Sequence, residues 1–270
     1  MVNPSRGDVR NALANRDAVY TGIARLLPRG RVEAQPEVLL VDSGTPVAEF
    51  NIALVGPSPT QPWSVVRRAT QFFRGTGRPW LLEFDPILRE VFFGPLEESA
   101  LSEVATVPGM LLHKDEFQPV GLPTGFSVTN VESAADLTRF DRVVVESFNL
   151  PPLKELLDFD WLAMRGTRCY LGWASGEPVA TALRFDYGEV AGIYCVGTLE
   201  RARRRGYGRA ITERAVIDGF GEHNKQSFLQ SSPLGMPVYS AMGYRHVFDH
   251  VLWSQPSVTE VYGRTAQASR

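Results

Sequence analysis

Apolar residues follow two periodicities along this chain, and the two alternate in a regular order. Apolar positions three and four residues apart are typical of helices, whereas short apolar runs between glycines and prolines are typical of strands. The first half is predicted to hold helices at 8–26 and 64–73, a hairpin at 38–55 and strands at 79–84 and 104–113. The second half is predicted to hold strands at 126–131, 168–173, 179–185, 190–199, 228–231 and 245–253, and helices at 133–148, 154–164, 206–220 and 236–242. This order predicts an α/β (α+β) fold in which helices flank a mixed central sheet.

A short internal echo indicates that the two halves are related. Residues 43–48 (SGTPVA) and 175–180 (SGEPVA) are identical at five of six positions, and each follows and precedes an apolar run. Ser-Gly-x-Pro in this setting predicts a hairpin turn, and it is also a common turn sequence that chance would produce. Residues 118–125 hold two prolines and two glycines in eight positions, a composition typical of linkers. We therefore predict two domains, residues 1–122 and 123–270, as tandem related halves.

The composition of the chain limits the kinds of partner that the protein is expected to bind. The chain has 270 residues, 44% of them apolar and 21% charged, with a formal net charge of −2. These values are ordinary for a globular protein and predict no general attraction to nucleic acid or to anionic membranes. No apolar run approaches the ~18 residues of a membrane helix, and the polar N-terminus shows no secretory signal. The two cysteines, Cys169 and Cys195, make neither a disulfide framework nor a metal-ligand cluster, so we expect a cytoplasmic protein without a metal.

The segment at residues 193–211, IYCVGTLERARRRGYGRAI, carries the clearest chemical signal. An apolar strand leads into a basic turn with two glycines, and a helix begins directly afterwards. The first N–H groups of a helix are unpaired and partly positive, glycines let a ligand approach the backbone closely, and arginines add fixed charge. These parts together suit a pyrophosphate. The alternatives are a nucleic-acid patch or localisation signal in RARRR and a merely solvated basic turn, whereas the P-loop and Rossmann glycine motifs are absent from this segment.

Arg203-x-x-Gly206-x-Gly208, placed after a strand and before a helix, resembles the [RQ]-x-x-G-x-[GA] signature of the GNAT N-acetyltransferases. The order of elements from residue 126 to 253 is similar to that of the GNAT fold, and residues 237–244 (PVYSAMGY) resemble the family's later LY-x-x-x-GF segment. The resemblance covers the second half of the chain. The first half has no such turn, because its equivalent at residues 55–62 holds three prolines, which lack N–H donors. We therefore predict that the first half is a degenerate GNAT-like domain without a cofactor site.

The resemblance implies that the second half binds acetyl-coenzyme A (acetyl-CoA) as a co-substrate. The end of the strand at 190–199 would pair its backbone with the pantetheine arm, and the N–H groups of residues 204–209 would bind the pyrophosphate. Ser232 stands where many members carry an asparagine that contacts pantetheine. The candidate cofactor-binding residues are Val196, Thr198, Leu199, Arg203, Arg204, Arg205, Gly206, Tyr207, Gly208, Arg209 and Ser232.

Acyl transfer to an amine requires a deprotonated amine, a polarised carbonyl and a stabilised thiolate. An alkylamine with a pKa of ~10.4 is mostly protonated at neutral pH, so a base is useful. In the family a tyrosine often protonates the departing thiolate, and by position this is Tyr239; the alternative is a tyrosine that only packs in the core. Some members carry a glutamate base where this chain has Gly192. The nearest carboxylate is Glu189, beside a turn where carboxylates are usually just solvated.

The functional hypothesis is an acetyl-CoA-dependent N-acetyltransferase that acts on a primary amine of a small molecule or peptide. The alternative, from a different class, is a non-catalytic acyl-CoA sensor or interaction protein that keeps the phosphate turn and lacks catalytic groups. The missing carboxylate at Gly192 favours that alternative. We expect neither a nucleic-acid partner nor a membrane partner.

Overall fold

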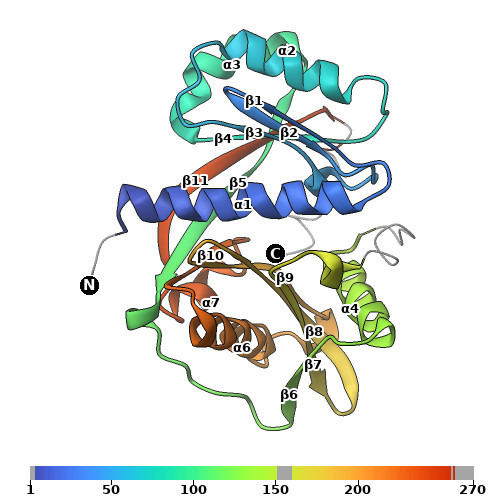
Figure 1. Ribbon diagram of the computed structural model, residues 1–270, viewed down its shortest axis with the longest axis vertical. Coiled ribbons are helices and arrows are strands. Elements are labelled where there is room, and N and C mark those ends of the chain that lie inside the picture. Colours follow the sequence, from blue (N-terminus) through green and yellow to red (C-terminus); the bar gives the residue numbers. More distant parts are fainter. Residues whose placement is uncertain (1–3, 151–159, 257, 259–270) are drawn as a thin grey trace. The chain divides into compact units, whose positions relative to one another are not determined.

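The chain passes between two structural units three times (Figure 1). The computed structural model describes residues 4–150, 160–256 and 258. The first unit comprises Met1–Ala18 and Met110–Val247, and the second comprises Val19–Gly109 and Phe248–Arg270. A single boundary between residues 122 and 123 does not describe this division. The reason is that one helix and two strands contribute residues to both units, namely α1 (Arg6–Leu26), β5 (Ser102–His113) and β11 (Arg245–Ser254).

The first unit is built on a sheet with the strand order β5-β10-β9-β8-β7-β6. Strands β6 to β9 are antiparallel to their neighbours, whereas β10 runs parallel to β9. A parallel pair requires a crossover, which helix α6 supplies between β9 and β10. The bounds are β6 (Phe126–Asn130), α4 (Ala134–Ser147), β7 (Thr167–Ala174), β8 (Glu177–Tyr187), β9 (Val190–Thr198), α6 (Tyr207–Glu222), β10 (Gln226–Gln230) and α7 (Met236–Ser240), with short 3-10 segments at Lys114–Glu116, Trp161–Ala163 and Glu200–Ala202.

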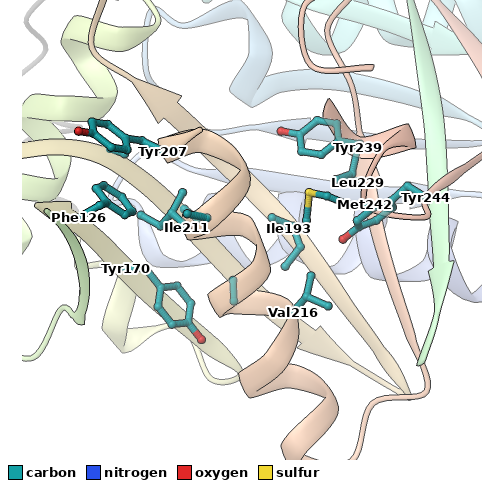
Figure 2. Packing of buried hydrophobic residues seen from close by; sticks show 14 of the residues in the cluster. Phe126, Tyr170, Ile193, Tyr207, Ile211, Val216, Leu229, Tyr239, Met242 and Tyr244 are labelled. Carbon is teal, nitrogen blue, oxygen red and sulfur yellow. The ribbon is translucent and has the colours of Figure 1, made fainter. Parts of the chain in front are cut away.

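Helices cover both faces of the central strands in this unit. Helices α6 and α4 both pack on β8 and β9, and they lie on opposite sides of these strands (Figure 1). On β9, Ala191 lies directly under Gly219 of α6, while Gly197 faces Ser147 of α4. Figure 2 shows the apolar core that α6 encloses, which includes Ile193 of β9. The helix starts with a buried Tyr207 whose ring stacks on Phe126 of β6, with 4.4 Å between the ring centroids.

The second unit has its own sheet, with the strand order β1-β2-β3-β4-β11. Strands β1, β2 and β3 are antiparallel, and β3 runs parallel to β4 through the crossover helix α2. A separate core forms under α2 and α3, where the rings of Phe73 and Trp80 stack with 4.8 Å between centroids. The bounds are β1 (Arg31–Gln35), β2 (Val38–Asp42), β3 (Asn51–Val55), α2 (Pro62–Phe73), β4 (Leu81–Phe84) and α3 (Arg89–Glu98), with 3-10 segments at Ala48–Phe50 and Pro86–Leu88.

Most predicted elements are present within a few residues of their expected ends. Ser133 is the N-cap of α4, because its hydroxyl accepts a hydrogen bond from the N–H of Asp136 at 3.1 Å. The pattern missed β1, whose side chains are mostly exposed, and α3, which contains Pro95 in its interior. The helix predicted at residues 154–164 falls largely outside the described residues, and its end forms the 3-10 segment Trp161–Ala163.

The internal echo does not align with the topology. Each unit contains three antiparallel strands, a crossover helix and a parallel strand: β1, β2, β3, α2 and β4 in one, and β7, β8, β9, α6 and β10 in the other. Residues 43–48 connect the second and third strands of their set, whereas residues 175–180 lie between the first and second. The echo therefore marks two turns that do not correspond. The similar order of elements remains as support for tandem GNAT-like halves, which stays a prediction.

Candidate acyl-CoA site

Strands β9 and β10 separate part-way along their length. Their parallel pairing runs from Val190 opposite Gln226 to Gly192 opposite Phe228. Beyond this point β9 continues for six residues to Thr198 and β10 for two to Gln230. A strand edge that has left its partner presents backbone N–H and C=O groups, which an extended ligand can pair with. The strand that is predicted to pair with pantetheine therefore leaves its neighbour directly after Gly192.

A β-bulge changes the direction of the β9 backbone just beyond the point where β9 and β10 separate. Between the pairs Thr181–Gly197 and Leu183–Tyr194, two residues of β9, Cys195 and Val196, stand opposite one residue of β8. Cys195 has a φ of 49°, and its carbonyl accepts a hydrogen bond from the Thr181 hydroxyl at 2.9 Å. Burial, and secondarily the carboxylate of Asp141, raise the pKa of the Cys195 thiol to about 12. The thiol is therefore neutral at physiological pH, and Cys195 contributes backbone geometry instead of a nucleophile.

The glycine turn presents N–H groups at the start of α6. Gly206 is the N-cap with a φ of 78°, a left-handed conformation that glycine adopts without strain. The first helical hydrogen bond runs from the Ala210 N–H to the Gly206 carbonyl at 3.0 Å. The N–H groups of residues 206–209 precede that bond, so they have no partner within the helix. A side chain at Gly208 would place its Cβ 3.3 Å from the Thr198 hydroxyl, so the turn and the end of β9 are in close contact.

The four predicted arginines have different roles. The Arg203 side chain donates to the carbonyls of Thr198 at 3.2 Å and Ser147 at 3.4 Å, which ties the turn to β9 and α4. Arg209 pairs with the buried carboxylate of Glu213 at 2.7 Å. Arg204 and Arg205 are exposed, and within the described ranges neither has a protein partner. These two guanidinium groups therefore supply the positive charge that an incoming phosphate would meet.

Some of the other predicted cofactor-binding residues line the predicted site, and others pack beneath it and support its structure. Val196 is half-buried at the bulge. Leu199 is buried, and its N–H donates to the Val179 carbonyl at 2.9 Å, so this amide is already engaged. Tyr207 is also buried and packs in the core. Ser232 is exposed just before α7, where its hydroxyl accepts from the Gly235 N–H at 3.2 Å.

Tyr239 lies on α7 and is linked to the glycine turn through Thr212 of α6. Its ring is buried and meets Tyr244 edge-on, with 5.9 Å between centroids (Figure 2). The phenol is hydrogen-bonded to Thr212, whose hydroxyl also donates to the Gly208 carbonyl at 2.9 Å. Burial raises the pKa of Tyr239 to about 12, against a smaller opposing effect of the Thr212 bond. Tyr239 thus packs in the core and is also connected to the turn. Its packing role is therefore compatible with the predicted role beside the thiolate.

The candidate base Glu189 is placed unfavourably for that role. It lies at the start of β9, before the paired stretch, and its exposed carboxylate forms an ion pair with Lys225 at 2.5 Å. The paired residues 190–192 separate the Glu189 carboxylate from the open part of β9, so Glu189 has no role in the proposed reaction. At Gly192 itself, a Cβ would lie 2.1 Å from Oδ1 of Asn15 and 2.6 Å from the Tyr194 ring. The space that a side chain would need at position 192 is therefore filled by α1.

Sequence reasoning missed Asn15 and Thr212 as residues of this site. Asn15 lies 179 positions before Tyr194, with which it shares a hydrogen bond of 2.7 Å. Thr212 lies inside a helix pattern and 27 positions before Tyr239. Neither belongs to a motif, and the one signal that could have indicated Asn15 is a polar residue at an otherwise apolar helical position.

The corresponding turn of the second unit is occupied by the chain itself. The carboxylate of Glu37 accepts hydrogen bonds from the N–H groups of Thr60 at 2.7 Å and Gln61 at 3.1 Å, at the start of α2. These bonds and the Thr60 hydroxyl lower the pKa of Glu37. A carboxylate of the chain itself thus binds the N–H groups that directly precede α2.

The described residues also bear on two other features, a metal site and a membrane-spanning helix. In residues 4–150, 160–256 and 258, no group of three or more histidine, cysteine, aspartate or glutamate side chains is arranged to hold a metal ion. Over the same part of the chain, no helix is both long and apolar enough to cross a membrane.

Comparisons with known proteins agree with this geometry. Residues 132–244 match the sequence model of the acetyltransferase (GNAT) family. A GCN5-related N-acetyltransferase from Kribbella flavida is similar in structure, with a TM-score of 0.69, 19% identity, and coverage of 91% of this chain and 96% of that chain. A GCN5-related N-acetyltransferase from Sphaerobacter thermophilus gives a TM-score of 0.61 at 15% identity, with coverage of 83% and 81%. A tandem GNAT protein from the clavulanic acid biosynthesis pathway gives 0.57 at 13%, with coverage of 90% and 91%. A comparison with curated protein sequences finds no match.

The fold and the family match together define the class of protein. The fold is a mixed α/β sheet flanked by helices, as in the GNAT structures. Residues 132–244 form a domain of the GNAT acetyltransferase family.

Proposed function

We propose that this protein transfers an acetyl group from acetyl-CoA to a primary amine. The observation that carries the proposal is the junction of an opened strand and a glycine turn within one segment. Strand β9 leaves β10 after Gly192 and leads, through a 3-10 segment, into the exposed N–H groups of Gly206 to Arg209. An extended backbone edge therefore adjoins a helix N-terminus, a combination that would suit a ligand with an amide-containing arm and a pyrophosphate.

The turn supplies the pyrophosphate site in this proposal. Consecutive N–H groups at the start of a 16-residue helix are favourable for phosphate because of their partial positive charge. Arg204 and Arg205 add two fixed charges beside them. Gly208 lets a phosphate oxygen come within hydrogen-bonding distance of the backbone, since any side chain there would project toward Thr198.

The opened part of β9 would hold the pantetheine arm and the thioester. The amides of the arm can pair with backbone groups of residues 193–198, as an added strand does. The bulge at Cys195 and Val196 turns a peptide out of the regular ladder, at the place where a thioester carbonyl needs a hydrogen-bond donor. Leu199 does not contribute to this polarisation, because its N–H is bonded to Val179.

Tyr239 would stabilise the departing thiolate by donating a hydrogen bond, for which its phenol proton has to turn away from the Thr212 hydroxyl, whose own proton is engaged by the Gly208 carbonyl. A thiol has a pKa of ~8.5, whereas that of Tyr239 is raised to about 12. Complete proton transfer from the phenol to the thiolate would therefore be uphill by roughly 5 kcal/mol. A hydrogen bond without full transfer carries no such cost, and the proton that the attacking amine loses can reach the thiolate through water.

The second candidate function is a non-catalytic acyl-CoA-binding protein. The observation that favours it is the absence of a carboxylate at Gly192, together with the exposed, lysine-paired position of Glu189. A binding protein needs the turn and the open strand, and it needs neither Tyr239 nor an amine site.

Two measurements on the full chain separate the candidates. Calorimetry with CoA and acetyl-CoA tests the binding site, and we expect a dissociation constant in the micromolar range. Thiol release from acetyl-CoA, with mass detection of the acetylated product, is followed with 2-phenylethylamine, spermidine, glucosamine and a lysine-containing peptide. Binding with amine-dependent product supports the transferase, and binding without any product favours the sensor. Absence of binding at millimolar CoA overturns both.

A further inference from the structure

The side-chain amide of Asn15 has one possible orientation. Asn15 lies on α1 within the first unit and is fully buried. Its Nδ2 group donates to the backbone carbonyls of Phe185 at 2.9 Å and Val190 at 3.0 Å. These two bonds use both protons of the amide, so the atom that remains toward β9 is the oxygen Oδ1.

That orientation determines the direction of the bond to Tyr194. The phenol oxygen of Tyr194 lies 2.7 Å from Oδ1 of Asn15. An amide oxygen carries no proton, so the phenol is the donor. With its single proton engaged, the Tyr194 oxygen can only accept any further hydrogen bond. A ligand group that meets it must therefore bring a donor such as an N–H.

Tyr194 lies on the face of β9 opposite α6, where Asn15 of α1 packs at Gly192 and α4 packs farther along at Gly197. The other face is covered by α6, where Ile193 packs beside Val216 (Figure 2). Side chains alternate along a strand, so Gly192 and Tyr194 project away from α6. Gly192 is the last residue of β9 paired with β10, which makes Tyr194 the first side chain of that face beyond the opening. Tyr194 is half-buried, so part of this residue is exposed to solvent.

The charge on this side of β9 suits a cationic group. Asp141 of α4 is buried, and its carboxylate helps to raise the pKa of the thiol at Cys195, the residue after Tyr194. Its negative potential therefore extends to this part of the strand. Opposite charges attract more strongly at partly buried sites than in water, so an arriving ammonium group would be drawn there before it loses the proton that its attack on the thioester requires.

We propose that Tyr194, held in place by Asn15, positions the acceptor amine by accepting a hydrogen bond from its N–H. This step rests on the proposed function, because it assumes that the thioester lies along β9 next to the bulge. An acceptor must then approach from the side of Tyr194, since α6 closes the other side. The substrate class is an amine with at least one N–H, and helix α1 acquires a role in acceptor binding through Asn15.

The test is a comparison of Tyr194→Phe with the matched control Tyr187→Phe. Both variants lose one phenol oxygen, and Tyr187 is half-exposed at the end of β8, away from the opening. The acceptor is the amine from the four-member panel that gives the fastest product formation with the wild type. Michaelis constants are measured separately for that amine and for acetyl-CoA, with thermal melts for all proteins.

We expect Tyr194→Phe to lower kcat/KM for the amine by about ten- to a hundredfold, the effect of one hydrogen bond to a charged group. The KM for acetyl-CoA should change less than twofold, and Tyr187→Phe should match the wild type. An unchanged amine KM and kcat in folded Tyr194→Phe overturns this inference alone. Equal losses for both substrates also overturn it, because they indicate a structural role. A wild type that forms no product with any amine overturns the transferase proposal, and this inference with it.

Discussion

Gly208→Ala should weaken coenzyme A binding while leaving the fold intact. The added Cβ would lie 3.3 Å from the Thr198 hydroxyl, which is a tight contact that a small shift of that side chain relieves. Alanine is a better helix former than glycine by roughly 0.5–1 kcal/mol, so stability should stay constant or rise slightly. Binding should change in the opposite direction, because the methyl group occupies the space through which a phosphate oxygen reaches the first N–H groups of α6.

The magnitude follows from the contact that is lost. A hydrogen bond between a backbone N–H and a charged phosphate contributes about 1.5–3 kcal/mol. Losing one such bond raises the dissociation constant by about ten- to a hundredfold, at about 1.4 kcal/mol for each factor of ten. Gly206→Ala would be a less informative change, because its φ of 78° makes any side chain strained and would mix folding with binding.

Gly221→Ala is the matched control. Gly221 lies in the same helix, and a Cβ there would have no atom within 4 Å. The assay is calorimetry with CoA on the wild type and both variants, together with thermal melts. We expect Gly221→Ala to bind as the wild type does. If folded Gly208→Ala binds CoA within twofold of the wild type, the phosphate is not held at this turn, and the reasoning from helix N–H groups is wrong.

Three further predictions concern other parts of the molecule. Tyr239→Phe should lower kcat about tenfold with little change in acetyl-CoA affinity, and a folded variant with wild-type kcat in steady-state kinetics would remove the phenol from the mechanism. Replacing both Arg204 and Arg205 with Gln should weaken CoA binding and flatten its dependence on NaCl concentration; a salt titration by calorimetry that leaves the slope unchanged would contradict this. Asp42→Asn should cost about 3 kcal/mol of stability, since Asp42 is fully buried against Arg78 at 2.6 Å. Burial opposes ionisation of Asp42, but its hydrogen bonds outweigh burial and lower its pKa, so the wild type should lose stability as pH falls below about 4, and urea unfolding of the Asn variant should lack that component.

The sequence by itself determined the features that depend on neighbouring residues. The glycine turn was readable because a strand, two glycines and a helix start follow one another within residues 193–211. The Ser133 cap and most strands of the first unit were readable for the same reason, since capping and alternation are local properties. Strand β1 and helix α3 were missed because their local patterns are weak, one being mostly exposed and the other containing Pro95.

The tertiary structure decided which distant residues complete the site. Nothing in the local pattern relates Asn15 to Tyr194 or Thr212 to Tyr239, because these bonds form only after α1, β9, α6 and α7 have packed. The same holds for Glu37, whose carboxylate binds the N–H of Thr60, just before α2, from 23 residues away. Periodicity indicates which face of an element is buried, but the partner it meets depends on the order of strands in the sheet. That β5 and β11 each contribute residues to both units is likewise a property of that order, and no composition of the linker at residues 118–125 could reveal it.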